Sequence, residues 1–110
     1  MTEKLLHNSS AGEILKTESI DEIDISQNHL AALIGVPANR IHAIVKGERR
    51  ITANTDLRLC KYFGLSDRYF LRLQNSYDIM EEKRKIQKST IDKIIPHHKK
   101  KDLKQLHASS

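Results

Sequence analysis

The sequence of 110 residues is long enough for one domain with a single modest core. Hydrophobic residues make up 38%, and the longest apolar run, Ala31–Ile34, is far shorter than the ~20 residues of a membrane helix. No secretory signal opens the chain and the single Cys60 cannot form an internal disulfide, so we expect a cytoplasmic protein in which Cys60 is a core side chain.

The formal net charge of +5 is distributed unevenly along the chain. Residues 1–24 contain two Lys and six acidic residues, whereas residues 40–72 contain eight basic and three acidic ones. Residues 83–110 contain nine basic and two acidic residues. Basic charge concentrated in this way suits a polyanionic partner, because each neutralised phosphate releases condensed counterions.

Capping residues and glycines predict an all-α protein of five helices. The expected helices are Ala11–Asp24, Ser26–Ile34, Ala38–Lys46, Thr52–Gly64, and one from Ser66 toward Lys85. Ser9 or Ser10 caps the first helix, and Ser26, Thr52 and Ser66 cap later ones. Gly47 and Gly64 stand where a glycine commonly ends a helix.

Three parts of the chain are expected. Residues 1–10 form a disordered N-terminus, residues 11–86 form the helical domain, and residues 87–110 form a basic tail. Ile91, Ile94 and Ile95 make an apolar cluster in that tail, which gives it a candidate role in dimerisation. Two alternatives remain for Asp92–Ile95: an extended segment paired as a short strand with a symmetry mate, or a loop folded onto its own subunit.

The segment Gln27–Lys46 has the pattern of a helix-turn-helix. The pattern needs a small residue at the helix crossing, a turn residue with positive φ, a buried residue after it, and two buried residues three apart. These positions hold Ala31, Gly35, Val36, Ile41 and Ile44. Leu30 and Ile34 complete the inward face of the first helix. A generic helical hairpin is the alternative interpretation.

The outward face of this segment carries residue types that bind DNA. Asn39 and Arg40 are candidates to read bases, because Asn pairs bidentately with adenine and Arg with guanine. Gln27, Arg49 and Arg50 are candidates to contact phosphates. The complete set of expected DNA-binding residues is Gln27, Ala38, Asn39, Arg40, His42, Ala43, Lys46, Arg49 and Arg50. For each of them the alternative is an ordinary solvated side chain.

The helix-turn-helix segment resembles the phage-repressor-like class, and residues 11–86 resemble the HigA-type antitoxins of bacterial toxin–antitoxin modules. The motifs that carry this resemblance are Gly12–Leu15, Ile25–Gln27, Gly35–Pro37, Arg40-Ile41, Ile44–Arg49, Ile51–Thr55, Leu57–Leu59, Tyr62–Gly64 and Leu73-Gln74. The chain departs from the family at Ala11, where a proline is usual, and at Phe70, where a bulky aromatic, often Trp, is usual.

The resemblance implies a dimer that represses its own operon and neutralises a small basic toxin, usually an mRNA-cleaving ribonuclease. The acidic residues between Glu13 and Asp24 are compatible with such a partner, although an ordinary solvated helix face explains them better. Two alternatives remain: a repressor without a toxin, and an RNA-binding module. RNA-binding modules usually expose aromatic side chains for stacking, whereas the aromatic residues between Tyr62 and Tyr77 suit core or dimer packing.

The fifth helix is the expected dimer interface. One recognition helix reads too few base pairs for operator specificity, so two half-sites about one DNA turn apart are expected. Three side chains of this helix are expected to pack on the core: Phe70, Leu73 and Tyr77. Three others remain for a partner to cover: Tyr69, Leu71 and Met80.

No catalytic, metal or cofactor site is expected. His97 and His98 are adjacent, so their side chains point in opposite directions in an extended segment, and His29 and His42 lie on separate helices. The sequence shows no Ser–His–acid order, glycine-rich phosphate loop or paired carboxylates. An enzyme is therefore not expected.

Overall fold

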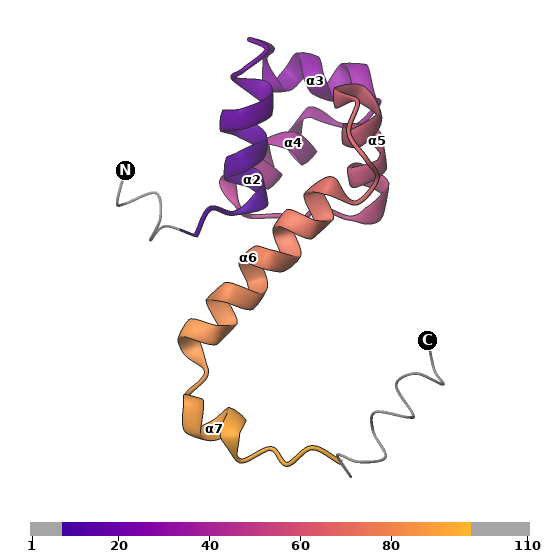
Figure 1. Cartoon of the computed structure of the whole chain (residues 1–110). Coiled ribbons are helices and arrows are strands. Elements are labelled where there is room, and N and C mark those ends of the chain that lie inside the picture. Colours follow the sequence, from indigo (N-terminus) through magenta and orange to yellow (C-terminus); the bar gives the residue numbers. More distant parts are fainter. Residues whose placement is uncertain (1–7, 98–110) are drawn as a thin grey trace.

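The computed structural model describes residues 8–97 and has the all-α architecture that the sequence predicts (Figure 1). The helices are α2 (Ala11–Ile14), α3 (Gln27–Ile34), α4 (Ala38–Lys46), α5 (Ala53–Phe63), α6 (Tyr69–Lys85) and α7 (Lys88–Asp92). A π-helical segment, η1 (Leu15–Ile20), continues α2. The expected helices from Ser26 to Ile34, from Ala38 to Lys46 and from Thr52 to Gly64 are confirmed as α3, α4 and α5 with their capping residues.

The first expected helix, Ala11–Asp24, is interrupted. Ser10 caps α2 through a reciprocal pair of hydrogen bonds with Glu13, of 3.2 and 2.8 Å. The helix then widens into η1 and gives way to a turn, in which Asp24 has a φ of 56°. Three acidic residues, Asp21, Glu22 and Asp24, explain the early end, because negative charge is unfavourable at a helix C-terminus. Of the expected disordered N-terminus, residues 1–7 lie outside the described part, and Asn8 Nδ2 donates to the Tyr77 carbonyl at 3.0 Å.

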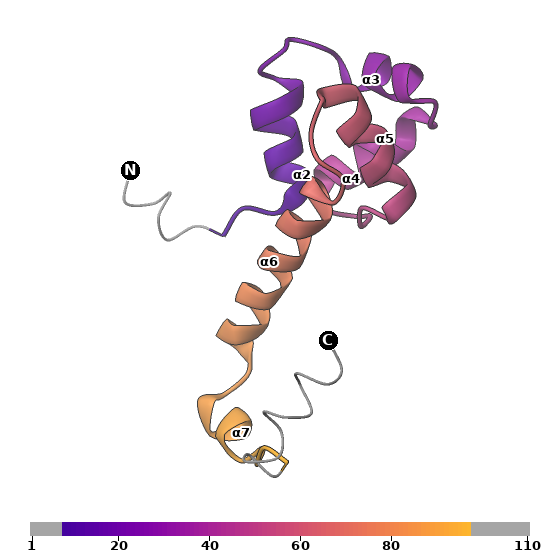
Figure 2. The ribbon, with the colours of Figure 1, turned by 45° about the vertical axis from the view of Figure 1, so that its right-hand side comes forward.

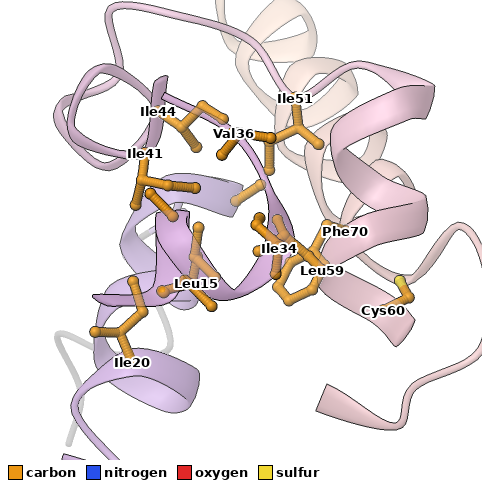
Figure 3. Close-up of a cluster of buried hydrophobic side chains, with 13 residues drawn as sticks. Leu15, Ile20, Ile34, Val36, Ile41, Ile44, Ile51, Leu59, Cys60 and Phe70 are labelled. Atoms are coloured by element: carbon orange, nitrogen blue, oxygen red, sulfur yellow. The ribbon is translucent and has the colours of Figure 1, made fainter. Parts of the chain in front are cut away.

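One hydrophobic core joins α2, η1, α3, α4, α5 and α6 (Figure 3). Its buried side chains include Leu15, Ile20, Leu30, Ala31, Ile34, Val36, Ile41, Ile44, Ile51, Leu59, Cys60 and Phe70. Every expected inward residue of the helix-turn-helix is among them. Each buried aliphatic side chain contributes ~1.5–3 kcal/mol of transfer free energy. Cys60 is fully buried in this core, so its expected core role is confirmed, and this burial raises the pKa of its thiol.

A close backbone contact fixes α2 against α4. Gly12 is buried, and a Cβ atom added there would overlap the carbonyl oxygen of Ile44. Glycine is therefore required at this crossing for space, because no positive φ is involved.

The expected start of the fifth helix at Ser66 is wrong. Helix α6 begins at Tyr69, after Arg68, whose φ is 76°. A carboxylate on α5 supplies the cap: Asp56 is 1% exposed and accepts three backbone N–H bonds. The donors are Arg68 N (2.7 Å), Phe70 N (3.0 Å) and Leu71 N (3.1 Å). A buried carboxylate that satisfies three donors outcompetes an exposed hydroxyl, so the tertiary contact sets the helix start.

The C-terminal half of α6 and the short α7 form an arm that projects from the domain (Figures 1 and 2). The expected extended conformation of Asp92–Ile95 is wrong at its first residue, because Asp92 ends α7 and pairs with Lys88 at 3.2 Å. Residues 8–97 contain no strand, and Leu71, expected on the partner-facing side, packs against the core. None of the helices in this range has the length and hydrophobicity to span a membrane.

Candidate nucleic-acid interface

The two helices of the helix-turn-helix are fixed by local contacts. Ser26 Oγ accepts from the His29 N–H at 3.0 Å and begins α3. Gly35 ends α3 with a φ of 74°, and Val36 N then donates to the Ala31 carbonyl at 3.0 Å. The chain turns sharply enough that α4 packs against α3, and the small Ala31 of α3 is fully buried.

The outward side of α4 is polar and carries no carboxylate. Asn39, His42 and Lys46 are exposed, whereas the two alanines of the expected site and Arg40 are half-buried. Gln27, on the first turn of α3, is also half-buried. Arg49 and Arg50 are exposed in the loop after α4. The expected residues therefore gather on α4, its following loop and the first turn of α3.

Two of the expected basic residues have protein partners. Arg50 Nη2 pairs with Asp78 Oδ2 of α6 at 2.6 Å, and this hydrogen bond and charge raise the pKa of Arg50. Arg40 Nη1 donates to Asn54 Oδ1 of α5 at 3.4 Å. The Arg50 side chain is 67% exposed in this pair, so the pair is a weak surface contact.

Four polar residues that the sequence analysis missed hold this surface in place. Arg58 Nη1 of α5 donates to the Ile34 carbonyl at 2.7 Å, which places a cation at the C-terminus of α3. Asn54 Oδ1 accepts from Arg58 Nε at 3.0 Å. The sequence signal that could have identified Asn54 and Arg58 is their spacing of four residues on one helix, which places both side chains on the same face.

The other two missed residues are Asn28 and Gln74. Asn28 Oδ1 lies 2.7 Å from His42 Nε2 and links the first turn of α3 to α4. Gln74 Oε1 accepts from the Ile51 N–H at 2.7 Å, and its Nε2 donates to the Ile51 carbonyl at 2.9 Å. This two-bond contact anchors the loop after α4 to α6. No sequence signal identified either contact, because the contacting residues are 14 positions apart in one case and 23 in the other.

The crossing of α3 and α4, the left-handed Gly35 and the polar face of α4 define a helix-turn-helix DNA-binding protein. A family model described as helix-turn-helix matches residues 20–70. The chain belongs to the HigA family of helix-turn-helix antitoxins, because it is 38% identical to a solved HigA-family protein and covers 99% of that protein's length.

Three similar proteins support this assignment. Virulence-associated protein I of Dichelobacter nodosus is 39% identical over 85 residues, which is 77% of each chain. The structure of a HigA-family addiction module antidote protein from Coxiella burnetii is 38% identical with a TM-score of 0.74, and the match covers 83% of this chain and 99% of that one. The structure of Pseudomonas aeruginosa antitoxin HigA with the higBA promoter is 32% identical with a TM-score of 0.73, over 82% and 98% of the two chains.

Proposed function

We propose that this protein is a dimeric antitoxin of the bacterial cytoplasm that represses its own operon and neutralises a small ribonuclease toxin. The observation that carries the DNA-binding part is the exposed face of α4, which presents Asn39, His42 and Lys46 and no carboxylate. A helix of this kind enters the major groove with its N-terminal residues at the base edges. The similarity to the Pseudomonas aeruginosa antitoxin HigA, whose structure includes the higBA promoter, supports DNA binding by this chain.

The DNA-facing residues have different proposed roles. Asn39, at the exposed start of α4, reads a base. Ala38 and Ala43 are small enough to let the helix approach the groove closely, and a methyl group there suits a thymine methyl. Lys46 and Arg49, with Gln27 at the start of α3, bind phosphates and fix the position of the helix. Asn28 holds His42, so its ring is oriented before DNA arrives. The weak pair with Asp78 leaves the exposed Arg50 able to bind a phosphate.

The arm supplies the proposed dimer interface. Three apolar side chains of the arm are exposed: Ile79 is 49% exposed, Met80 45% and Ile91 47%. Ile79, Ile86 and Ile91 line a groove of about 630 Å³ between the end of α6 and α7. Apolar surface of this kind on a monomer marks an interaction site, and a second copy of the arm is the occupant that gives the dimer two recognition helices.

Light scattering tests the dimer. The wild-type chain at micromolar concentration is expected to have twice the monomer mass, and an Ile79→Lys/Ile91→Lys variant is expected to be monomeric with unchanged helicity. A matched control is Lys83→Ala, which removes a charge from the same groove without adding one to its apolar lining. A monomeric wild type would contradict the interface.

Toxin neutralisation is tested in cells. The gene adjacent to this one is expressed from an inducible promoter, with and without the antitoxin chain. The proposal expects growth arrest that co-expression relieves, together with co-purification of the two proteins. If the neighbouring gene encodes no toxic small basic protein, the protein is a repressor without a toxin partner, and the toxin part of the proposal is wrong.

A further inference from the structure

Arg40 and Arg58 converge on one neutral acceptor beside the recognition helix. Arg40 lies on the first turn of α4 and Arg58 on the second turn of α5. The Oδ1 atom of Asn54 accepts from Arg40 Nη1 at 3.4 Å and from Arg58 Nε at 3.0 Å. Two guanidinium groups are thereby held close together at the base of the helix-turn-helix.

No carboxylate in the described part of the chain pairs with either of these two cations. Arg40 Nε is shielded from solvent and has no hydrogen-bond partner among these residues. An unsatisfied buried donor is costly, and like charges in close contact repel each other. The arrangement therefore lacks an anion.

We propose that Arg40, Asn54 and Arg58 form a binding site for one phosphodiester of the DNA backbone. Guanidinium groups bind phosphate through paired, charge-assisted hydrogen bonds, and the planar fork of arginine matches the geometry of two phosphate oxygens. The 3.4 Å bond from Arg40 to Asn54 is long and weak, so Arg40 exchanges it readily for a phosphate oxygen. Arg40 then acts on the backbone and does not read a base.

The inference rests on the proposed DNA binding and deepens it in two ways. It adds Asn54 and Arg58 to the DNA interface. It also changes the proposed role of Arg40 from reading a base to positioning the protein on the DNA backbone. Arg58 also donates a hydrogen bond to the Ile34 carbonyl at the C-terminus of α3. The phosphate contact is therefore coupled to the geometry of the helix-turn-helix.

Asn54→Asp separates this site from a merely structural network. The added carboxylate lies between both guanidinium groups, so it neutralises the site while strengthening the contacts that hold α4 to α5. We expect an equal or higher melting temperature together with weaker DNA binding. A purely structural network predicts that stability and DNA affinity change in the same direction.

The assay is a fluorescence anisotropy titration of the full chain with a random-sequence duplex of about 20 base pairs at several salt concentrations. Arg40→Ala and Asn54→Asp are each expected to weaken binding and to reduce the slope of log K against log salt by about one. Arg72→Ala, which removes an exposed cation of α6, is the matched control and is expected to leave the slope unchanged.

Three results would overturn the inference. Wild-type affinity and salt slope in both Asn54→Asp and Arg40→Ala would exclude a phosphate contact. If Arg40→Ala weakened the binding of only one preferred DNA sequence, Arg40 would be a base-reading residue. A wild-type chain that binds no duplex at all would overturn the proposed DNA binding as well, which distinguishes the two failures.

Discussion

Replacing Asp56 by alanine is expected to destabilise the domain more than any surface change on α5. The Asp56 side chain is 1% exposed and accepts the backbone N–H groups of Arg68, Phe70 and Leu71. Alanine leaves these three donors without an acceptor at the start of α6. The helix that carries the arm then loses its N-terminal cap.

The magnitude follows from the burial of the three donors. The Phe70 bond is buried, so its unsatisfied N–H costs ~1–3 kcal/mol, and the two part-buried bonds each contribute ~0.5–1.5 kcal/mol. The expected loss is therefore ~2–6 kcal/mol of unfolding free energy, against a typical total of ~5–15 kcal/mol for a domain. Asp56→Asn keeps one carbonyl oxygen and is expected to lose roughly half as much.

Urea unfolding followed by circular dichroism measures this loss. Ser66→Ala and Asp67→Ala are the matched controls, because both residues are exposed near the start of α6, where the sequence favoured a local cap. Each control is expected to change the unfolding free energy by less than about 0.5 kcal/mol. A loss in either control as large as that of Asp56→Ala would refute the assignment of the cap to α5.

Other predictions follow from single contacts. Gly12→Ala is expected to cost ~1–3 kcal/mol of stability in thermal melts, because its Cβ would overlap the Ile44 carbonyl of α4, and wild-type melting would refute the close crossing. Gly35→Val is expected to lower the melting temperature, because valine is strained at a φ of 74°. Ala31→Leu is expected to cost ~1–3 kcal/mol of stability, because the larger side chain overpacks the contact between α3 and α4. Unchanged melting temperatures of both variants would contradict the helix-turn-helix geometry. Cys60 is expected to react slowly with iodoacetamide at neutral pH and rapidly in denaturant, since burial raises the pKa of its thiol; fast labelling of the native protein would contradict its packing.

The helix-turn-helix could be predicted from sequence because its determinants are local. Ser26 caps a helix three residues from its hydrogen-bond partner, and Gly35 supplies a positive φ that few other residues adopt without strain. The hydrophobic spacing of Ile41 and Ile44 then fixes which side of α4 faces the core. All of these features lie within one 20-residue window.

The start of α6 and the widening of the first helix into η1 could not be predicted in the same way. Asp56 accepts hydrogen bonds from backbone N–H groups 12 to 15 residues further along the chain. Such a tertiary contact has no local signal, so the sequence alone favours Ser66 as the cap. The widening of the first helix into η1 likewise has no local signature. For the candidate site, the surface residues were identified by type, but their partners Asn28, Asn54 and Asp78 lie on other helices.

The conformation of the tail could not be predicted for a different reason. The isoleucines after residue 90 indicated an apolar contact, but hydrophobicity alone does not distinguish a strand from a short helix over five residues. The hydrogen bond from Ile91 N to the Gln87 carbonyl and the Lys88–Asp92 pair favour the helical turn of α7. Residues 98–110, which include His98, lie outside the described part of the chain.

The central claim is sequence-specific DNA binding through α4, and the most direct test compares two duplexes at one salt concentration. One duplex carries the DNA upstream of this gene, and the other carries the same bases in shuffled order. Fluorescence anisotropy is expected to show at least ~10³-fold tighter binding of the upstream DNA, and Asn39→Ala is expected to remove ~1–3 kcal/mol of that preference. Equal affinity of the wild-type protein for both duplexes, or an Asn39→Ala variant with the full preference, would contradict the account.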